Sequence, residues 1–256
     1  MARNNVNIYS VKGEVVRSVE LPKAFATEYR PDLIHRAAVA EQANKRQPYG
    51  PSPEAGMRHA VSQWGKGRGV ARVQRLTQGS KAAESPNNVG GRRAWPPKPE
   101  KDYSKKVNRK EKAKARLSAL AAISDAEIVK KRGHQFEDGV TMPVVVEDGF
   151  EGLATTSDVY AALDSIGLAA DIDRAKDGRK VRAGRGKMRS RRYKSPRSIL
   201  VVVSAKEAPL FMGAGNLPGV EVVSTEGLSA GVLAPGGMPG RLTVFSESAL
   251  KKIGEW

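Results

Sequence analysis

Four short aliphatic runs alternate with helical patterns in the second half of the chain. They lie at residues 143–147, 199–203, 220–223 and 242–245. Runs this short and continuously apolar are typical of strands buried on both faces, as in a parallel sheet. Because helical patterns separate them, we predict an α/β fold in which a mainly parallel sheet is covered by helices on both faces. The pattern leaves the order of the strands open.

The N-terminal part of the chain and the helix ends carry their own signals. Residues 6–22 predict two short strands around a turn, and Pro31 predicts the first position of a helix. Further helix starts show a small polar residue followed three positions later by an acid. These pairs are Asn108 with Glu111, Ser124 with Glu127, Thr155 with Asp158, and Ser204 with Glu207. Gly133 and Gly167 are placed to end the second and third of these helices.

Residues 47–106 show neither helical nor strand periodicity. The segment has 60 residues and is rich in Gly, Pro, Ser and Arg. Structureless loops of this length are uncommon in compact domains and are usually functional or disordered. Trp64, Trp95 and Tyr103 lie among its arginines and offer stacking surfaces beside positive charge. We expect this loop to become ordered only against a partner.

The charge of the chain is concentrated in two places. The net charge is +17, yet residues 58–116 hold 17 Lys and Arg against 4 acids, and residues 174–197 hold 12 against 1. The rest of the chain is therefore acidic, whereas an ordinary solvated surface would mix the two signs throughout. Such segregation indicates a polyanionic partner, with nucleic acid first and an acidic membrane surface second. The segment 174–197 is predicted to be a loop or hairpin that projects from the α/β body.

Composition excludes several other classes of protein. The chain has no cysteine, so it contains neither disulfides nor thiolate metal sites. Its aliphatic runs are too short to cross a bilayer, and its first ten residues lack the apolar core of a secretory signal. We therefore expect a soluble, cytoplasmic protein without a membrane partner.

Two glycine-rich stretches superficially match enzyme motifs. Gly65–Gly69 resembles a dinucleotide loop but lacks the strand before it and the helix after it. Gly227–Gly231 matches the nucleophile elbow of hydrolases, but that motif needs a histidine later in the chain. The histidines at 35, 59 and 134 all precede it, and their spacing fits no metal site. We expect a surface turn at Gly227–Gly231, and no catalytic residue, metal or cofactor.

Two further candidates receive structural interpretations. His134 follows a predicted helix end, where it would serve as a cap or lie beside RNA. Asp171 and Asp173 are separated by one residue and are placed at a strand end beside Arg174. We expect these carboxylates to neutralise their basic neighbours.

Several segments together resemble one protein family. Residues 29–50, 64–72, 91–122 and 233–250 are similar, in this order, to the archaeal form of the "L-four" family of large-subunit ribosomal proteins. The resemblance covers essentially the whole chain. The sequence stops at Trp256, without the long basic C-terminal extension of the eukaryotic members.

The resemblance implies a non-enzymatic protein that binds large-subunit ribosomal RNA early in assembly. In this family the α/β domain sits at the outer surface of the particle, and the long loop helps to form the wall of the polypeptide exit tunnel. The implied partners are that RNA, neighbouring large-subunit proteins and the nascent polypeptide. Gly65, Gly67, Arg68, Gly69 and Arg72 match the glycine-arginine motif of the family. Its returning strand is matched by Arg92, Arg93, Trp95 and Lys98.

The prediction is thus a single α/β domain, residues 1–256, from which a loop at 47–106 and a basic loop at 174–197 project. The RNA-binding residues predicted in and beside the first loop are Trp64, Gly65, Lys66, Gly67, Arg68, Gly69, Arg72, Arg75, Arg92, Arg93, Trp95, Lys98, Lys101, Lys105 and Arg109. Those of the second loop are Arg182, Arg185, Lys187, Arg189, Arg191, Arg192, Lys194 and Arg197. Two alternatives share the basic loops: an RNA-modifying or RNA-processing enzyme, and a free nucleic-acid chaperone.

Overall fold

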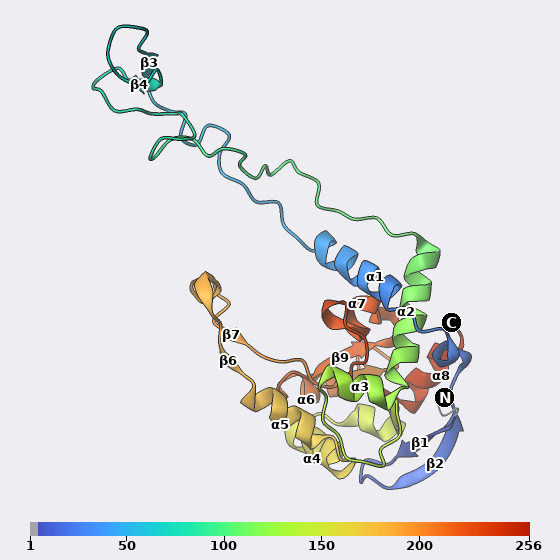
Figure 1. Ribbon diagram of the computed structural model, residues 1–256. Coiled ribbons are helices and arrows are strands. Elements are labelled where there is room, and N and C mark those ends of the chain that lie inside the picture. The colour runs from blue at the N-terminus through green and yellow to red at the C-terminus, as the bar shows by residue number, and fades with distance from the viewer. Residues whose placement is uncertain (1–4) are drawn as a thin grey trace. The chain divides into compact units, whose positions relative to one another are not determined.

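A computed structural model describes residues 5–256 (Figure 1). Internal contacts divide the chain into two compact units. We call the larger unit the body; it runs to Gln42 and resumes over Lys106–Trp256. The smaller unit, Ala43–Lys105, is called the arm.

The body is built on a six-stranded sheet in the order β2-β1-β5-β10-β8-β9. Its strands are β1 (Asn5–Tyr9), β2 (Val15–Glu20), β5 (Val144–Val146), β8 (Leu200–Val203), β9 (Glu221–Ser224) and β10 (Thr243–Ser246). Only β1 and β2 pair antiparallel; the other neighbours are parallel. The α/β class and the mainly parallel sheet are therefore confirmed, and each of the four aliphatic runs forms a strand.

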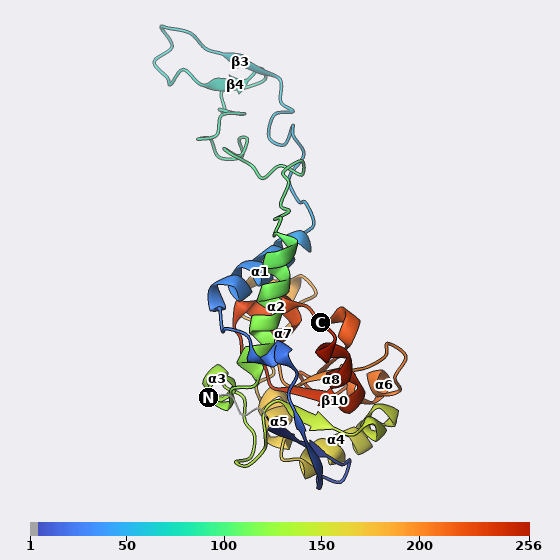
Figure 2. The same ribbon diagram turned by 90° about the vertical axis from the view of Figure 1, so that its right-hand side faces the viewer.

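Side chains of the central strands alternate between two apolar clusters. Val144, Val201 and Val244 lie in a cluster with residues of α4 (Thr156–Ser165), α5 (Ala169–Asp177) and α6 (Leu210–Ala214). Their neighbours Val145 and Phe245 lie in a second cluster with residues of α2 (Arg109–Ile123) and α8 (Glu247–Gly254). This period of two is what a pleated strand imposes, and it explains why the runs are apolar at every position. Figure 2 shows these helices around the sheet.

The helices among the described residues are α1 (Pro31–Asn44), α2 (Arg109–Ile123), α3 (Ala126–Arg132), α4 (Thr156–Ser165), α5 (Ala169–Asp177), α6 (Leu210–Ala214), α7 (Ala230–Leu233) and α8 (Glu247–Gly254). Four of these eight helices, α2, α3, α4 and α8, begin after a side chain that accepts from a free backbone N–H. The predicted start of α1 at Pro31 is confirmed. The predicted caps Asn108 and Thr155 accept hydrogen bonds from Lys110 N and Asp158 N. Gly133 ends α3 in the left-handed conformation, as predicted.

Short 3-10 helices fill several connections of the body. They cover Lys23–Ala26, Asp148–Gly152, Gly184–Met188, Thr225–Gly227 and Pro235–Gly237.

Two predicted helix starts are wrong. Asp125, not Ser124, caps α3, because its carboxylate accepts from Glu127 N while Ser124 Oγ donates to Ala121 O of α2. Ser204 starts no helix: its backbone N and its hydroxyl both donate to Glu151. In both cases the local sequence fits a capping box, but the serine forms its hydrogen bonds with a different residue.

The arm contains an antiparallel pair that the sequence did not predict. Strand β3 (Val61–Gln63) pairs with β4 (Gln74–Leu76). Three residues per strand are too few to show a period of two, and the residues are mostly polar. Ala83 is the only apolar residue among the arm's described positions that is buried. The arm therefore has local hydrogen bonds but almost no core.

Residues 174–197 form the predicted hairpin only in part. The segment begins inside α5 and continues through β6 (Lys180–Val181), which pairs antiparallel with β7 (Tyr193–Lys194). Asp171 and Asp173 consequently lie on a helix rather than at a strand end. Helix α5 was not predicted because its buried face includes Asp171, which interrupts the apolar period of the helix.

Candidate nucleic-acid interface

The predicted basic residues of the arm lie at its surface. Arg75 is half-buried, and every other predicted Lys or Arg of this unit is exposed: Lys66, Arg68, Arg72, Arg92, Arg93, Lys98, Lys101 and Lys105. In the second basic segment Arg182 is half-buried, and Arg185, Lys187, Arg189, Arg191, Arg192, Lys194 and Arg197 are exposed. The predicted cations are thus accessible to a ligand.

Few of these cations are neutralised within the chain. In the described part of segments 47–106 and 174–197, ion pairs join only Arg58 to Glu54, Arg174 to Asp171 and Arg197 to Glu221. Exposed positive charges without acidic partners repel one another and create a field that attracts polyanions. Both segments therefore carry the electrostatic footprint of a nucleic-acid interface.

The two tryptophans of the arm differ in their availability. Trp64 is half-buried, and the guanidinium carbons of Arg68 and Arg75 lie 4.6 Å and 5.3 Å from the centroid of its ring. Such cation–π contacts occupy the ring within the arm itself. Trp95, in contrast, is 95% exposed. It is the tryptophan that is free to stack on a base, whereas Trp64 organises the basic loop around itself.

The glycines between Trp64 and Arg72 differ from other residues in their backbone angles and in the open space around them. Gly67 and Gly69 have φ angles of +86° and +65°, which side-chain-bearing residues rarely adopt. A Cβ atom added at Gly65, Gly67 or Gly69 would meet no protein atom within 4 Å. The protein itself therefore leaves this backbone open, so a phosphate can approach it closely.

The base of the arm is held by contacts within that unit. Asn44 Nδ2 donates to the carbonyl oxygen of Lys105 at 3.3 Å, and Lys105 N donates back to Asn44 Oδ1 at 2.8 Å. The guanidinium carbon of Arg46 lies 4.3 Å from the ring centroid of Tyr103. The outgoing and returning chains are thus joined where the arm begins and ends.

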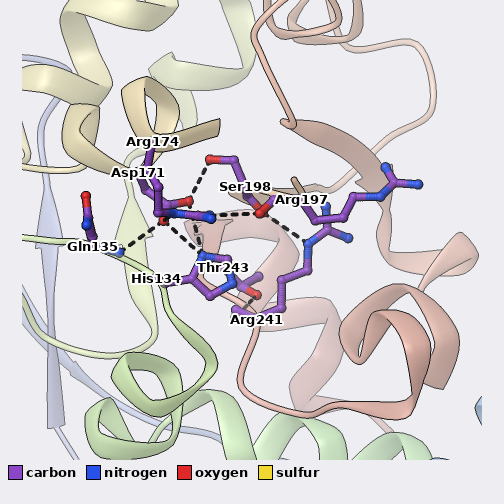
Figure 3. Close-up of polar contacts among 8 residues, drawn as sticks. All are labelled: His134, Gln135, Asp171, Arg174, Arg197, Ser198, Arg241 and Thr243. Carbon is purple, nitrogen blue, oxygen red and sulfur yellow. Dashed lines mark hydrogen bonds and ion pairs between the residues drawn. The ribbon is translucent and has the colours of Figure 1, made fainter. Parts of the chain in front are cut away.

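The root of the second basic segment is a buried ion network around Asp171 (Figure 3). The carboxylate of Asp171 is fully buried and accepts from His134 Nδ1 at 3.1 Å and from Arg174 Nε at 2.9 Å. Ser198 Oγ donates to it at 2.7 Å, and Gln135 N donates at 3.0 Å. Four donors from three separate parts of the chain, residues 134–135, 174 and 198, therefore converge on one carboxylate.

This network fixes both ends of the second basic segment. Arg174 Nη2 donates to the carbonyl oxygen of Arg197 at 2.9 Å, which joins the first and last residues of segment 174–197. Next to it, Arg241 is fully buried and donates through Nε to Ser198 O and through Nη1 to Glu221. The hairpin therefore projects from a rigid base, although its own strands are short.

The environment determines the protonation of Asp171. Burial alone would raise its pKa, but the hydrogen bonds from His134, Arg174 and Ser198 and the nearby charges outweigh burial and hold the pKa well below the usual range. Arg132, half-buried near Arg241 and Arg174, has a pKa lowered to about 10, first by burial and then by these like charges. Asp171 is thus the central counter-ion of this basic region.

Asp171, His134 and the Gly227–Gly231 stretch lie outside the predicted RNA-binding residues. Asp171 does neutralise Arg174, as predicted, but Asp173 forms no ion pair among residues 5–256 and accepts from Tyr160 Oη instead. His134 acts as a cap, since its backbone N donates to Val129 O at the end of α3, and its side chain is buried against Asp171. The Gly227–Gly231 stretch is no free surface turn: Ser229 is half-buried, donates to Glu41 Oε2 at 2.9 Å and precedes the short helix α7.

Sequence reasoning included Arg109 but missed two cations on the same face of α2. Lys112 and Arg116 follow Arg109 at helical spacing, which places all three side by side. The spacing was the available signal; what faces these residues comes from the far C-terminal part of the chain.

Residues 5–256 contain no cluster of three or more His, Asp or Glu that could hold a metal ion. Over the same residues, no helix has the length and apolar character needed to cross a membrane.

Comparison with known proteins identifies the family. The model of the ribosomal protein L4/L1 family matches residues 19–256. The chain belongs to this family. It is 47% identical to the large ribosomal subunit protein uL4 of Archaeoglobus fulgidus, over 97% of this chain and 98% of the relative. The proteins of the same name from Methanocaldococcus jannaschii and Methanoculleus marisnigri are 50% and 49% identical, each over 97% of this chain and 97% and 98% of the relative.

Membership of the L4/L1 family decides between the classes of function. The resemblance inferred from the sequence is confirmed, and the similar proteins named above are archaeal. A ribosomal protein of this family is a structural component rather than an enzyme, so the RNA-modifying enzyme is excluded.

Proposed function

We propose that this protein is a structural constituent of the large ribosomal subunit and that it binds large-subunit ribosomal RNA through its two basic segments. The observation that carries the proposal is the set of exposed cations in residues 47–106 and 174–197, nearly all without an acidic partner. Arginine is suited to this role because its planar fork bridges phosphate oxygens and stacks on bases.

In this proposal the body and the arm act differently. The body is a single α/β domain, with both faces of its sheet covered by helices, and provides a folded anchor in the cytoplasmic ribosome beside neighbouring large-subunit proteins. The arm has almost no core, so its order depends on the RNA around it. This dependence favours a role for the protein in assembly, because ordering of the arm accompanies folding of the RNA.

We further propose that the middle of the arm contributes to the wall of the polypeptide exit tunnel. The arm is joined at its base by the hydrogen bonds between Asn44 and Lys105, so its middle projects furthest from that base. About 30 residues on each leg would span roughly 100 Å if fully extended, which leaves ample reach after folding back. Val70 and Val89, which are 45% and 104% exposed, lie in this middle portion.

A photocrosslinking experiment tests the tunnel assignment. A photoreactive phenylalanine derivative would replace Val89 or Val70 in ribosomes that carry a stalled nascent chain. We expect the nascent chain to be labelled from at least one of these positions. The matched control is the same substitution at Val16 of β2, which is 59% exposed on the body.

Labelling from Val16 alone, or from none of the three positions, would refute the tunnel assignment. Assembly of each variant into the large subunit, measured by sedimentation, reports separately on RNA binding. The two parts of the proposal can therefore fail independently.

A further inference from the structure

A small basic hollow lies on the body, and no residue of 47–106 or 174–197 lines it. It has a volume of about 310 Å³, at the lower end of the range for ligand pockets. One wall is the face of α2 that carries Arg109, Lys112 and Arg116, and the other is the segment from Glu226 to Ala230 that precedes and begins α7. Residues separated by more than 100 positions thus enclose a site lined by three cations.

The cations of this hollow have no counter-ion in the described part of the chain. None of the three lies within ion-pair distance of an acid among residues 5–256. Glu226 lines the hollow, but its carboxylate is bound by Lys206 at 2.7 Å. Nearby Glu111 of α2 is instead bound to Arg36. The positive charge that faces the hollow is therefore uncompensated.

Arg116 is held in place but incompletely satisfied. Its guanidinium carbon lies 3.8 Å from the ring centroid of Trp256, so the aromatic ring orients the fork. Its Nε atom is buried and has no hydrogen-bond partner. Burial lowers the pKa of Arg116. A buried donor without a partner is uncommon in folded proteins, so the chain itself does not fully satisfy this guanidinium.

We propose that this hollow binds a phosphate group of the RNA backbone. Three cations side by side, one of them an arginine oriented by the Trp256 ring, match an anion that offers several acceptor oxygens. The inference rests on the proposed RNA-binding function and adds a site on the body itself, where the RNA meets the rigid fold rather than an arm. Of its residues, only Arg109 belonged to the interface predicted from the sequence.

The test compares two pairs of substitutions on the same helix in the full chain. Arg109→Gln with Lys112→Gln removes two charges that face the hollow and makes no change to the Arg116–Trp256 stack. Lys110→Gln with Lys114→Gln removes two charges from exposed positions of α2 that do not line the hollow. Both pairs lower the net charge equally, so a general electrostatic effect is the same in each.

Affinity for large-subunit ribosomal RNA, transcribed in vitro, would be measured by filter binding over a series of salt concentrations. We expect the first pair to weaken binding by roughly 10- to 100-fold, because hydrogen bonds to charged groups are lost. We also expect the slope of log affinity against log salt to fall by about 1.5–2. The second pair should stay within about threefold of the unaltered protein, since Lys110 and Lys114 do not line the hollow and would lose no contact with the bound phosphate. Melting curves followed by circular dichroism check that both pairs fold.

A single substitution adds a geometric test. Arg116→Lys keeps the charge but loses the planar fork, and we expect it to weaken RNA binding by about tenfold. Equal losses from the two pairs, or no loss from the first pair, would overturn the proposal. Melting in inorganic phosphate gives a further outcome against the proposal. If phosphate raises the melting temperature of the unaltered protein but not that of the first pair, while both proteins bind RNA with the same affinity, the hollow binds a free anion and not the RNA backbone. If the unaltered protein itself fails to bind the RNA, the proposed function fails rather than this site.

Discussion

Replacing Asp171 with Asn is expected to lower the free energy of unfolding of the body by about 3–5 kcal/mol at neutral pH. The substitution leaves Arg174 without its ion-pair partner and removes a negative charge that acts on the fully buried Arg241. The Asp171 carboxylate accepts from four donors through two oxygens, whereas the amide that replaces it has only one oxygen. Urea unfolding of the full chain, followed by circular dichroism, measures the effect.

Asp173→Asn is the matched control on the same helix. Asp173 is exposed, and its contact with Tyr160 Oη is long, at 3.4 Å. We expect a change within about 0.5 kcal/mol, as for an ordinary surface substitution. If Asp171→Asn were equally mild, the network in Figure 3 would not be the anchor that we describe.

The pH dependence of stability gives an independent check on Asp171. The folded-state pKa of this carboxyl lies below its unfolded value, so its contribution is fully present above the ordinary Asp pKa of about 4 and is lost as the pH falls through the folded pKa. The difference in unfolding free energy between the unaltered protein and Asp171→Asn should therefore be constant from about pH 5 to 8. It should narrow only below about pH 4. A difference that narrows already near neutral pH would contradict this account.

Affinity for isolated ribosomal RNA is expected to fall roughly 10³–10⁵-fold between about 50 and 200 mM salt, if 6 to 10 phosphates are neutralised. The two charged regions recognised in the sequence hold 17 and 12 basic residues, so this number of contacts is within reach. Contacts to single-stranded regions release fewer counter-ions and would give the lower end of the range. Filter binding across the salt series measures the slope.

Charge-removing variants assign that slope to the arm. Lys66→Gln with Arg68→Gln should reduce it by about 1.5–2, whereas Lys12→Gln with Lys23→Gln, at exposed positions outside both basic segments, should leave it unchanged. If RNA affinity did not change with salt concentration, or if the two pairs changed the slope equally, phosphate neutralisation by the arm would not be the main contribution to RNA binding.

The strands were predictable because their burial on both faces produces a continuous apolar run in the local sequence. A strand with apolar clusters on both faces must be apolar at each position, and 199–203 shows this without any knowledge of its partners. Helix α5 was not predictable in this way. One of its most buried residues is Asp171, which is stabilised by donors at 134, 135 and 198 that no local window contains. Ser204 failed for a similar reason, since its partner Glu151 lies 53 residues away.

The interface was predictable in composition but not in arrangement. The clustering of Lys and Arg identified both basic segments, and the family resemblance identified the glycine-arginine motif at 65–72. Sequence alone could not separate Trp64, which is surrounded by Arg68 and Arg75, from Trp95, which is free. It also could not show that Trp256 packs on Arg116. Such pairings depend on tertiary contacts rather than on local pattern.

The central claim, that the two basic segments lie against large-subunit ribosomal RNA, can be measured directly by tethered hydroxyl-radical cleavage. The chain has no cysteine, so Lys66→Cys, Arg185→Cys and the control Val16→Cys each provide a single attachment point for an iron chelate. Each variant would be assembled into large subunits and the RNA analysed by primer extension. Our account predicts strong cleavage at discrete nucleotides of the large-subunit RNA from positions 66 and 185, and weaker cleavage or none from position 16. Assembled subunits in which positions 66 and 185 cleave no more RNA than position 16 would contradict it.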